Sequence, residues 1–370
     1  MIQVFRPSIG EEEIKAVADV LRSGWLGSGP KTAEFEQKFA KKITASYALA
    51  TNSATAALNV MCYTFLNPGD EVITPSFTFI ASNNAIRLAN AVPIFADIDP
   101  VTLTIDPDEV EKNITKKTKA ILAVHYGGQP ANMKKLQLIA KKHKLLLFED
   151  CAHATGTYYY GKHAGNFSDA AAFSFAAIKN MTTGDGGMVV SPHKRKIERM
   201  RMLCWSGISK STWQRSGKKI YSWEYNVKEL GWKYQMNDIA AAIGLVQLEH
   251  MDAMNEHRRG VADHYQKAFQ DLSWARIPVE QEHTVHAFHN YFLLVEPSLR
   301  QRLIEHLAKK NVSSTVHYYP NHMYPIYKQF RKKLPVTERI YKSIVNIPIF
   351  SNMLDSERDI VIDAVLSFKP

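Results

Sequence analysis

One lysine stands in surroundings suited to covalent chemistry. Lys179 follows a run of apolar and small residues (173–178) and precedes a glycine-rich segment (184–187) that lets the backbone approach a ligand closely. A lysine whose pKa is lowered by its surroundings can form a Schiff base. Asp150, at the end of the apolar run 145–148, can hold a proton on a cationic ring nitrogen. The two settings together indicate pyridoxal 5′-phosphate (PLP), with Lys179 bonded to the cofactor and Asp150 paired with its ring nitrogen.

Each of these residues also has an ordinary interpretation. The chain is rich in lysine, and most lysines are solvated surface groups. A lysine followed by a glycine-rich segment, and preceded along the chain by a strand that ends in an acidic residue, is unlikely to arise by chance. We therefore prefer the cofactor hypothesis.

The phosphate of PLP needs backbone amides, and helix N-termini supply them. Residues 51–55 (TNSAT) lie at a predicted strand-to-helix turn and offer amides and hydroxyl groups, including that of Ser53. Ser53 could instead simply cap the helix, and the two roles are compatible. Ser174, on the strand before Lys179, adds another hydroxyl.

The cofactor ring needs a flat neighbour. Phe77 and Phe79 follow a predicted strand end, and their spacing alone does not decide which of them stacks on the ring. His153 could pack on the ring or hydrogen-bond to it, and its alternative role is that of a core histidine.

Strands and helices alternate around these residues. The predicted strands are 46–50, 71–74, 93–96, 120–124, 145–148, 170–175 and 187–190, and the predicted helices are 53–65, 79–88 and 133–143. This alternation predicts an α/β fold with a mostly parallel central sheet flanked by helices. Active sites of such sheets lie beyond the strand C-termini, where Asp150 and Lys179 fall.

A smaller α+β C-terminal domain is predicted to follow. A helix over 237–251, capped by Asn237 or Asp238, leads into it. We expect a large PLP-binding domain with an N-terminal segment over 1–250 and a small domain over 251–370. In the small domain the predicted strands are 291–295 and 313–317, and the predicted helices are 298–309 and 356–368.

Composition limits the other classes of function. The three cysteines are widely spaced, so neither a disulfide framework nor a metal site is expected. The chain has no apolar run of about eighteen residues and no signal-peptide pattern at its start, which predicts a cytoplasmic protein without a membrane span. The net charge of +10 is spread along predicted helices, without the interleaved aromatics that nucleic-acid binding favours. A basic surface would still attract an anionic substrate.

Several stretches together resemble a known family. They are 51–58 (TNSATAAL), 75–81 (PSFTFIA), 124–128 (VHYGG), 149–156 (EDCAHATG), 173–187 (FSFAAIKNMTTGDGG), 231–248, and the outlying 25–30 (WLGSGP) and 316–320 (VHYYP). In these stretches the chain resembles the DegT-type nucleotide-sugar aminotransferases. These belong to fold type I, the aspartate-aminotransferase-like PLP enzymes.

The resemblance implies a role for each matching residue. Lys179 matches the cofactor lysine, Asp150 the partner of the ring nitrogen, His153 the ring-packing residue and Phe79 the stacking aromatic. The matching phosphate contacts are Ala54, Thr55 and Ser174, next to Ser53. Residues placed to touch the sugar or nucleotide are Trp25, Gly27, Ser28, Lys31, His317 and Tyr318.

The family is dimeric, and a segment of the partner chain completes each site. That segment falls near Lys233, where many relatives carry asparagine. The resemblance implies that Lys233 binds the cofactor, since a lysine there could also meet a phosphate. Ala176 is a second departure, because many relatives have histidine or tyrosine there. Lysine at 179 argues against the branch that carries histidine and removes a sugar hydroxyl.

The expected reaction follows from the resemblance. An amino group moves from L-glutamate, which leaves as 2-oxoglutarate, through pyridoxamine 5′-phosphate (PMP) to the keto carbon of a nucleotide-linked sugar. The motifs look closest to members that aminate C4 of UDP- or dTDP-linked sugars, including those serving lipopolysaccharide modification. A C3-keto sugar, a cyclitol ketone, another PLP enzyme such as a decarboxylase or lyase, and a PLP-binding regulator are the alternatives.

Overall fold

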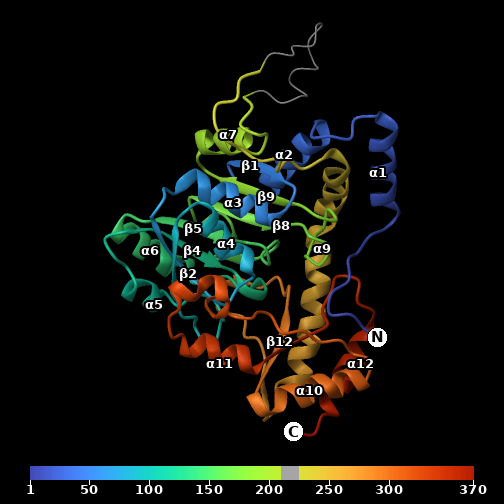
Figure 1. Ribbon diagram of the computed structural model, residues 1–370. Coiled ribbons are helices and arrows are strands. Elements are labelled where there is room, and N and C mark those ends of the chain that lie inside the picture. Colours follow the sequence, from blue (N-terminus) through green and yellow to red (C-terminus); the bar gives the residue numbers. More distant parts are fainter. Residues whose placement is uncertain (210–224) are drawn as a thin grey trace.

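The computed structural model describes residues 1–209 and 225–370, and its larger lobe is built on a seven-stranded sheet (Figure 1). The strand order is β1-β9-β8-β5-β4-β2-β3. Strand β9 runs antiparallel to both its neighbours, and the other pairs of this sheet are parallel. The strands are β1 (Tyr47–Thr51), β2 (Glu71–Pro75), β3 (Val92–Ala96), β4 (Thr118–Val124), β5 (Leu146–Asp150), β8 (Ala170–Ser174) and β9 (Gly187–Ser191).

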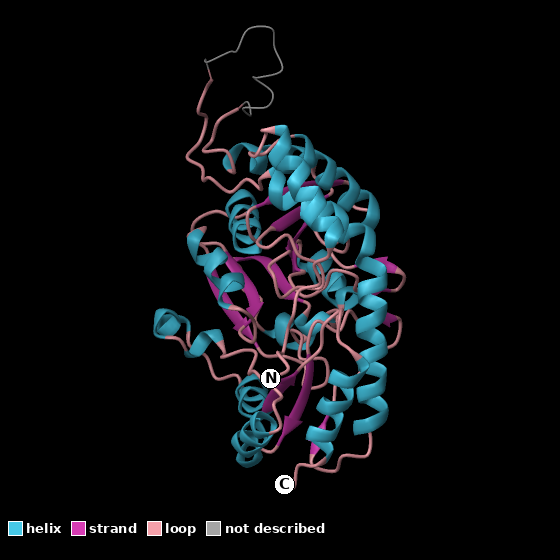
Figure 2. Ribbon diagram, turned by 90° about the vertical axis from the view of Figure 1, so that its right-hand side faces the viewer, coloured by secondary structure: helices cyan, strands magenta, loops and turns pink. Residues whose placement is uncertain are grey.

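Helices cover both faces of this sheet, and Figure 2 shows the strands enclosed between them. Neighbouring strand residues alternate between the faces: Val72 belongs to the core under one helical layer and Ile73 to the core under the other. One layer contains α3 (Ala54–Phe65), α4 (Ile80–Leu88) and α7 (Lys194–Leu203). The other contains α2 (Pro30–Ile43), α5 (Pro107–Lys112), α6 (Met133–His143) and the first half of α9 (Asp238–Phe269).

The smaller lobe contains a three-stranded antiparallel sheet. Its central strand β12 (Tyr291–Val295) lies between β10 (Ala275–Arg276) and β13 (Ile344–Ile347). The second half of α9 packs here with α10 (Pro297–Lys309), α11 (Pro335–Ser343) and α12 (Asp355–Leu366). Short elements complete the described chain: η1 (Tyr126–Gly128), η2 (Asn321–Met323), η3 (Pro325–Phe330), and a small sheet of β6 (Tyr158–Tyr159), β7 (Lys162–His163) and β11 (Thr284–Val285).

The N-terminal segment crosses from one lobe to the other. Its helix α1 (Glu11–Ser23) packs on α9. Before that helix, Ile2 forms a bridge with Val312 of the smaller lobe, and the Arg6 guanidinium donates two hydrogen bonds to the Glu357 carboxylate at 2.8 and 2.9 Å. Both chain ends therefore lie on the smaller lobe (Figure 1).

The α/β class and the mostly parallel sheet are confirmed. Asn237 is also confirmed as a cap, because its Oδ1 accepts from the Ala240 amide at 2.8 Å. The helix predicted over 237–251 continues to Phe269, so its predicted end is wrong. The division into domains at residue 250 stays a prediction. Among the helices of residues 1–209 and 225–370, none has the length and apolarity to cross a membrane.

The strand predicted over 313–317 is wrong. In this segment only Thr315 pairs with a strand, through Asn346 of β13. Beyond it, the carbonyl of His317 accepts a hydrogen bond from the Tyr126 hydroxyl at 2.6 Å. Val316 packs against the hydrophobic cluster to which Tyr126 belongs, and these contacts accompany the departure of the chain from the edge of β13.

Candidate active site

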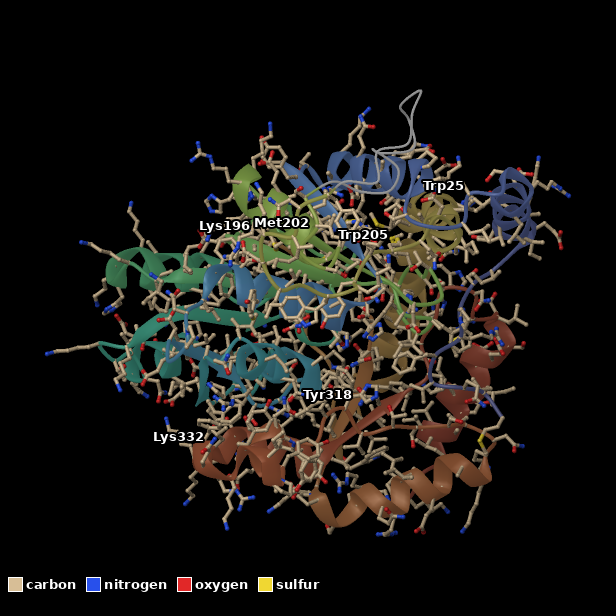
Figure 3. All side chains as sticks on the ribbon, turned by 45° about the horizontal axis from the view of Figure 1, so that its top comes forward. Trp25, Lys196, Met202, Trp205, Tyr318 and Lys332 are labelled. Carbon is tan, nitrogen blue, oxygen red and sulfur yellow. The ribbon has the colours of Figure 1, made fainter. Side chains whose placement is uncertain are left out.

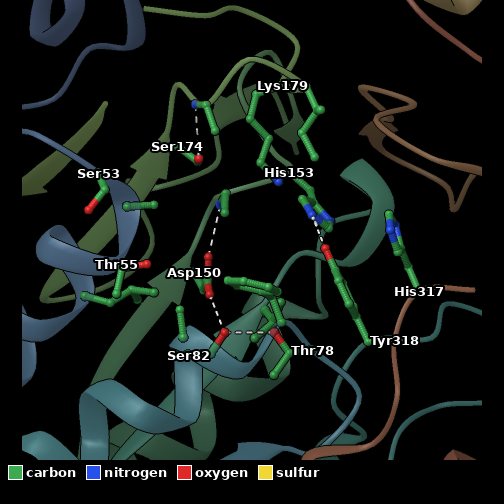
Figure 4. A pocket seen from close by; sticks show the side chains of 18 of the residues that line it. Ser53, Thr55, Thr78, Ser82, Asp150, His153, Ser174, Lys179, His317 and Tyr318 are labelled. Atoms are coloured by element: carbon green, nitrogen blue, oxygen red, sulfur yellow. Dashed lines mark hydrogen bonds between the residues drawn. The ribbon is translucent and has the colours of Figure 1, made fainter. Parts of the chain in front are cut away.

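A cavity of about 330 Å³ lies beyond the C-terminal ends of β4, β5 and β8, and residues of the smaller lobe close one side (Figure 4). Ten predicted site residues line it: Ser53, Ala54, Thr55, Phe79, Asp150, His153, Ser174, Lys179, His317 and Tyr318. The parallel register explains part of this assembly, since Asp150 pairs with Val124 and with Ala172 at the same edge of the sheet.

Asp150 is almost completely buried at the end of β5, and both of its oxygens accept hydrogen bonds. Oδ2 accepts from the Ser82 hydroxyl at 2.7 Å, and Oδ1 accepts from the Ala152 amide at 3.0 Å. Ser82 in turn contacts the Thr78 hydroxyl at 2.8 Å. Burial raises the pKa of Asp150, against the opposing effect of the Ser82 hydrogen bond. A cationic ring nitrogen in front of this carboxylate would relieve the cost of burying it.

The preceding residue, Glu149, holds β5 in place from the opposite side of the strand. One of its oxygens accepts from the Gly165 amide, and the other accepts from the Ser168 hydroxyl and the Phe167 amide. The buried His125 completes the set: its Nδ1 accepts from the Ala131 amide, so Nε2 carries the proton that is donated to Glu149 at 2.9 Å. Alternation along the strand then directs Asp150 to the cavity side.

Lys179 lies on the loop after β8, and its amine faces the cavity (Figure 4). Burial lowers the pKa of Lys179 to about 8, although the nearby charge of Asp150 acts in the opposite direction. A large share of this amine is therefore neutral near pH 8, which a nucleophile or a general base requires.

His153 and Tyr318 form a hydrogen-bonded pair beside the lysine (Figure 4). The Nδ1 of His153 accepts from the Gly127 amide at 3.2 Å, so the neutral ring carries its proton on Nε2. That Nε2 contacts the Tyr318 hydroxyl at 2.9 Å. Burial lowers the pKa of His153 well below its usual range, and the charge of Lys179 adds to this effect. Tyr318 accepts from His153 and can still donate its own proton into the cavity.

The predicted anion site falls at the N-terminus of α3. Ser53 caps the helix, since its Oγ accepts from the Ala56 amide at 3.1 Å. The amides of Ala54 and Thr55, in the first turn, have no acceptor within the helix itself. A Cβ at Gly187 would lie 2.5 Å from the Ser53 carbonyl and 2.6 Å from the Ala54 nitrogen. Only glycine lets β9 pass this close to the turn.

The structure also separates the two phenylalanines that spacing could not. Phe77 is buried and packs on Tyr126, with the ring centroids 5.0 Å apart. Phe79 lines the cavity with 55% of its surface exposed, and its ring lies beside Tyr318 at 6.0 Å. Phe79 is therefore the aromatic that a bound ring can reach.

These features fit PLP. The two amides of the first turn of α3, which have no acceptor within the helix, suit its phosphate. The buried carboxylate of Asp150 suits a protonated ring nitrogen, and the amine of Lys179 suits its aldehyde. Phe79 and His153 provide aromatic surfaces for the ring, and Ser174, which is also buried in the lining, adds a hydroxyl.

The remaining predicted residues gather elsewhere. Trp25, Gly27, Ser28 and Lys233 line a second hollow of about 290 Å³, which shares no lining residue with the first. Figure 3 shows Trp25 and Trp205, another residue of this hollow, well apart from Tyr318. The Lys233 ammonium lies 3.3 Å from the centre of the Trp205 ring.

One carboxylate fixes the backbone next to the second hollow. Asp238, at the start of α9, accepts hydrogen bonds from the amides of Gly29, Lys31 and Thr32 at 2.8 to 3.1 Å. The Lys31 side chain, predicted to bind substrate, lies outside the lining of both hollows and pairs with Glu34 at 3.2 Å.

Sequence reasoning missed several lining residues of the first cavity. Thr78 and Ser82 stand within or next to the 75–81 stretch: Thr78 precedes the cap of α4, Ser82 lies in its first turn, and their hydroxyl groups meet at 2.8 Å. Two hydroxyl residues flanking a predicted helix start were the available signal. Ala176, noted as a departure from the family pattern, also lines the cavity. The other missed residues are Leu58, Ala81, Val124, Ala152, Ile178, Asp185 and Gly186.

An α/β fold of this topology with a lysine and a buried aspartate at the strand ends defines the class of PLP-dependent transferases of fold type I. Residues 7–366 match the model of the DegT/DnrJ/EryC1/StrS aminotransferase family. The chain belongs to this family.

Relatives agree over almost the whole length. The spore coat polysaccharide biosynthesis protein SpsC of Bacillus subtilis is 40% identical, covering 97% of this chain and 95% of its own. The sugar aminotransferase CalS13 from Micromonospora echinospora has a similar structure, with a TM-score of 0.92, 29% identity and full coverage of both chains. Spr1654 from Streptococcus pneumoniae, solved in its PMP form, has a TM-score of 0.92, 30% identity and coverage of 98% of each chain. The protein is thus a sugar aminotransferase of the DegT family, with PLP as its implied cofactor.

Proposed function

We propose that this protein transfers the amino group of L-glutamate to the keto carbon, C4 in preference to C3, of a nucleotide-linked keto sugar. The product would serve the synthesis of a surface polysaccharide or lipopolysaccharide. The observation that carries this proposal is the lysine of lowered pKa facing a buried, hydrogen-bonded aspartate across one cavity. The match with SpsC, a polysaccharide biosynthesis protein, supports the pathway class.

PLP, when bound, supplies an electron sink that stabilises negative charge on the substrate carbon. Asp150 keeps the proton on the ring nitrogen of the cofactor, because its buried carboxylate is stabilised by a cation. The neutral Lys179 amine removes the proton from the donor carbon and later delivers one to the sugar carbon. The Tyr318 hydroxyl accepts a hydrogen bond from the Nε2 of His153, which orients it, and it donates its own hydrogen bond into the cavity.

We also propose a homodimer in which the second hollow of one chain completes the first cavity of the other. Trp25, Gly27, Ser28 and Lys233 are grouped together but do not reach Lys179 of their own chain. A lysine and two tryptophans suit a nucleotide, since the cation meets a phosphate and the flat rings meet the base. The net charge of +10 favours such an anionic substrate.

The test is a screen of UDP-, dTDP- and GDP-linked 4-keto sugars with L-glutamate, with the product identified by mass spectrometry and NMR. We expect an amino sugar carrying nitrogen at C4 and an equal amount of 2-oxoglutarate. The Lys179→Ala variant should form neither. Amination at C3, or of a cyclitol ketone, would replace the C4 assignment with the alternative substrate class.

The second hollow has its own test. Mixing a Lys179→Ala chain with a Lys233→Ala chain should restore activity if the two hollows meet across subunits, because one site of the mixed dimer is then intact. If mixed dimers form but the mixture is no more active than the two separate variants, the shared site is refuted.

A further inference from the structure

The residue after the lysine, Asn180, is buried and hydrogen-bonded through its whole side-chain amide. Asn180 is 3% exposed, and its side-chain Nδ2 donates to the Asn255 Oδ1 at 2.7 Å and to the Ala287 carbonyl at 2.8 Å. Its Oδ1 contacts the Nδ1 of His289 at 3.2 Å. All three partners come from residues beyond 250, on α9 and on the loop before β12.

This arrangement fixes how His289 is protonated. Both N–H groups of the Asn180 amide are used as donors, so its oxygen faces His289 and accepts. The neutral imidazole must then carry its proton on Nδ1. Its Nε2 has no hydrogen-bond partner within residues 1–209 and 225–370. Of the two ring nitrogens of His289, Nδ1 is therefore hydrogen-bonded and Nε2 is not, among the residues that the structure describes. A buried polar atom without a partner calls for an explanation.

His289 also belongs to a closed circle of aromatic rings beside the cavity. Its ring lies 4.2 Å from that of His153, and Tyr318 and His317 continue the circle at 5.9 and 4.7 Å. Phe5 closes it, stacked between His289 at 5.2 Å and His317 at 5.7 Å with both interplanar angles below 10°.

Phe5 reaches this place because the N-terminal segment is anchored on both sides of it. The Val4 carbonyl accepts from the Ile349 amide at 3.2 Å, and the Arg6 guanidinium binds Glu357. The circle therefore joins three distant parts of the chain: the N-terminal segment, the large lobe through His153, and the small lobe.

We propose that Asn180 and His289 are positioning residues, which with Phe5 set the place of the Lys179 amine and of His153; this rests on the aminotransferase function proposed above. Asn180 holds the backbone from which the lysine side chain starts, and His289 holds both Asn180 and the face of His153. A displacement of about 1 Å in such a system lowers a rate by as much as 100-fold. The rival explanation is that these contacts only fasten the two lobes together.

Two replacements of His289 separate its two contacts. His289→Phe keeps a flat ring against Phe5 and His153 but removes the N–H donated to Asn180. His289→Asn keeps a donor at the Nδ1 position but loses the ring. Tyr265→Phe is the matched control, since it deletes a buried hydroxyl of the small lobe away from the lysine loop. That hydroxyl contacts the Pro348 carbonyl at 2.9 Å and the Met353 sulfur at 3.7 Å.

The PLP-loaded enzyme is mixed with L-glutamate, and conversion of the bound cofactor to PMP is followed by absorbance in a single turnover. We expect His289→Phe to slow this step about 10- to 100-fold, with the KM for glutamate and the cofactor content little changed. His289→Asn should regain much of the rate, and Tyr265→Phe should equal the wild type.

A second readout does not involve turnover. The pH midpoint of the absorbance change of the resting, PLP-loaded enzyme should rise in His289→Phe. That change reports the protonation of the nitrogen that joins Lys179 to the cofactor, and water that reaches this nitrogen stabilises its charged form. Unchanged rate and midpoint in His289→Phe would overturn the proposal, as would rate losses in all three variants that simply follow their loss of thermal stability. If His289→Phe does not fold, Asn255→Ser removes another partner of Asn180 and is judged by the same outcomes. A wild type that fails to react with glutamate would instead count against the proposed donor.

Discussion

Replacing Lys179 by methionine should make the cofactor-free protein more stable, and more so at lower pH. The pKa of this amine falls from 10.5 to about 8 on folding because the site is buried. Since the unfolded chain takes up the proton first, stability is lost as the pH falls from 10.5 to 8 and stays low below 8. Methionine has a similar length and no charge, so the variant lacks this penalty.

The size of the effect follows from the shift. A difference of about 2.5 pKa units corresponds to about 3.4 kcal/mol. By surface area the lysine is only partly buried, so water screens its charge, and we expect a measured gain of about 1–2 kcal/mol at pH 7. The gain should shrink as the pH rises above 8 and should vanish only above about pH 11.

Urea unfolding of the two cofactor-free proteins at several pH values between 6.5 and 10 measures this difference. Lys15→Met, at an exposed lysine of α1, is the control and should change stability by less than about 0.5 kcal/mol at each pH. A Lys179→Met protein that is less stable than the wild type at pH 7, or a gain that does not depend on pH, would refute the reasoning.

Four further variants test residues at or next to the cavity. Asp150→Asn cannot hold the ring proton, so the rate of cofactor conversion by glutamate should fall by about 100-fold or more in stopped-flow absorbance, and a loss below threefold would contradict the role given to this carboxylate. Ser82→Ala removes a hydrogen bond to a charged group, worth about 1.5–3 kcal/mol, and should weaken PLP binding at least about tenfold in a fluorescence titration. Thr78→Val, one step further from the carboxylate, should have a clearly smaller effect, and equal effects would show that the hydroxyl pair acts only by packing. Gly187→Ala places a methyl group against the backbone of Ser53, so it should cost about 1–3 kcal/mol of stability and reduce PLP binding; unchanged binding would mean that this turn does not hold the phosphate.

The residues that line the candidate site could largely be predicted to lie together, because they stand next to strand ends. Asp150 and Lys179 follow apolar runs whose alternation with helices fixes the edge on which they emerge. Ser53 was predictable for the same reason, because a helix start is a local property of the sequence. The choice between Phe77 and Phe79 was not local, since it depends on which of them packs on Tyr126.

The failures lie where distant segments meet. Residues 313–317 have a β-rich composition. Within this segment, however, only Thr315 pairs with a strand, and the carbonyl of His317 accepts a hydrogen bond from the Tyr126 hydroxyl instead. No periodicity reveals that a phenylalanine at position 5 and a histidine at position 289 stack on each other. Such contacts are set by the tertiary fold and not by local propensity.

Helix α9 has a consequence for how substrates come and go. A helix of 32 residues is about 48 Å long, and here it is packed against both lobes. Swinging the lobes apart would require bending this continuous rod or breaking its hydrogen bonds. We therefore expect substrates to enter and leave the cavity through displacements of side chains and loops at its mouth, and not through a wide separation of the two lobes.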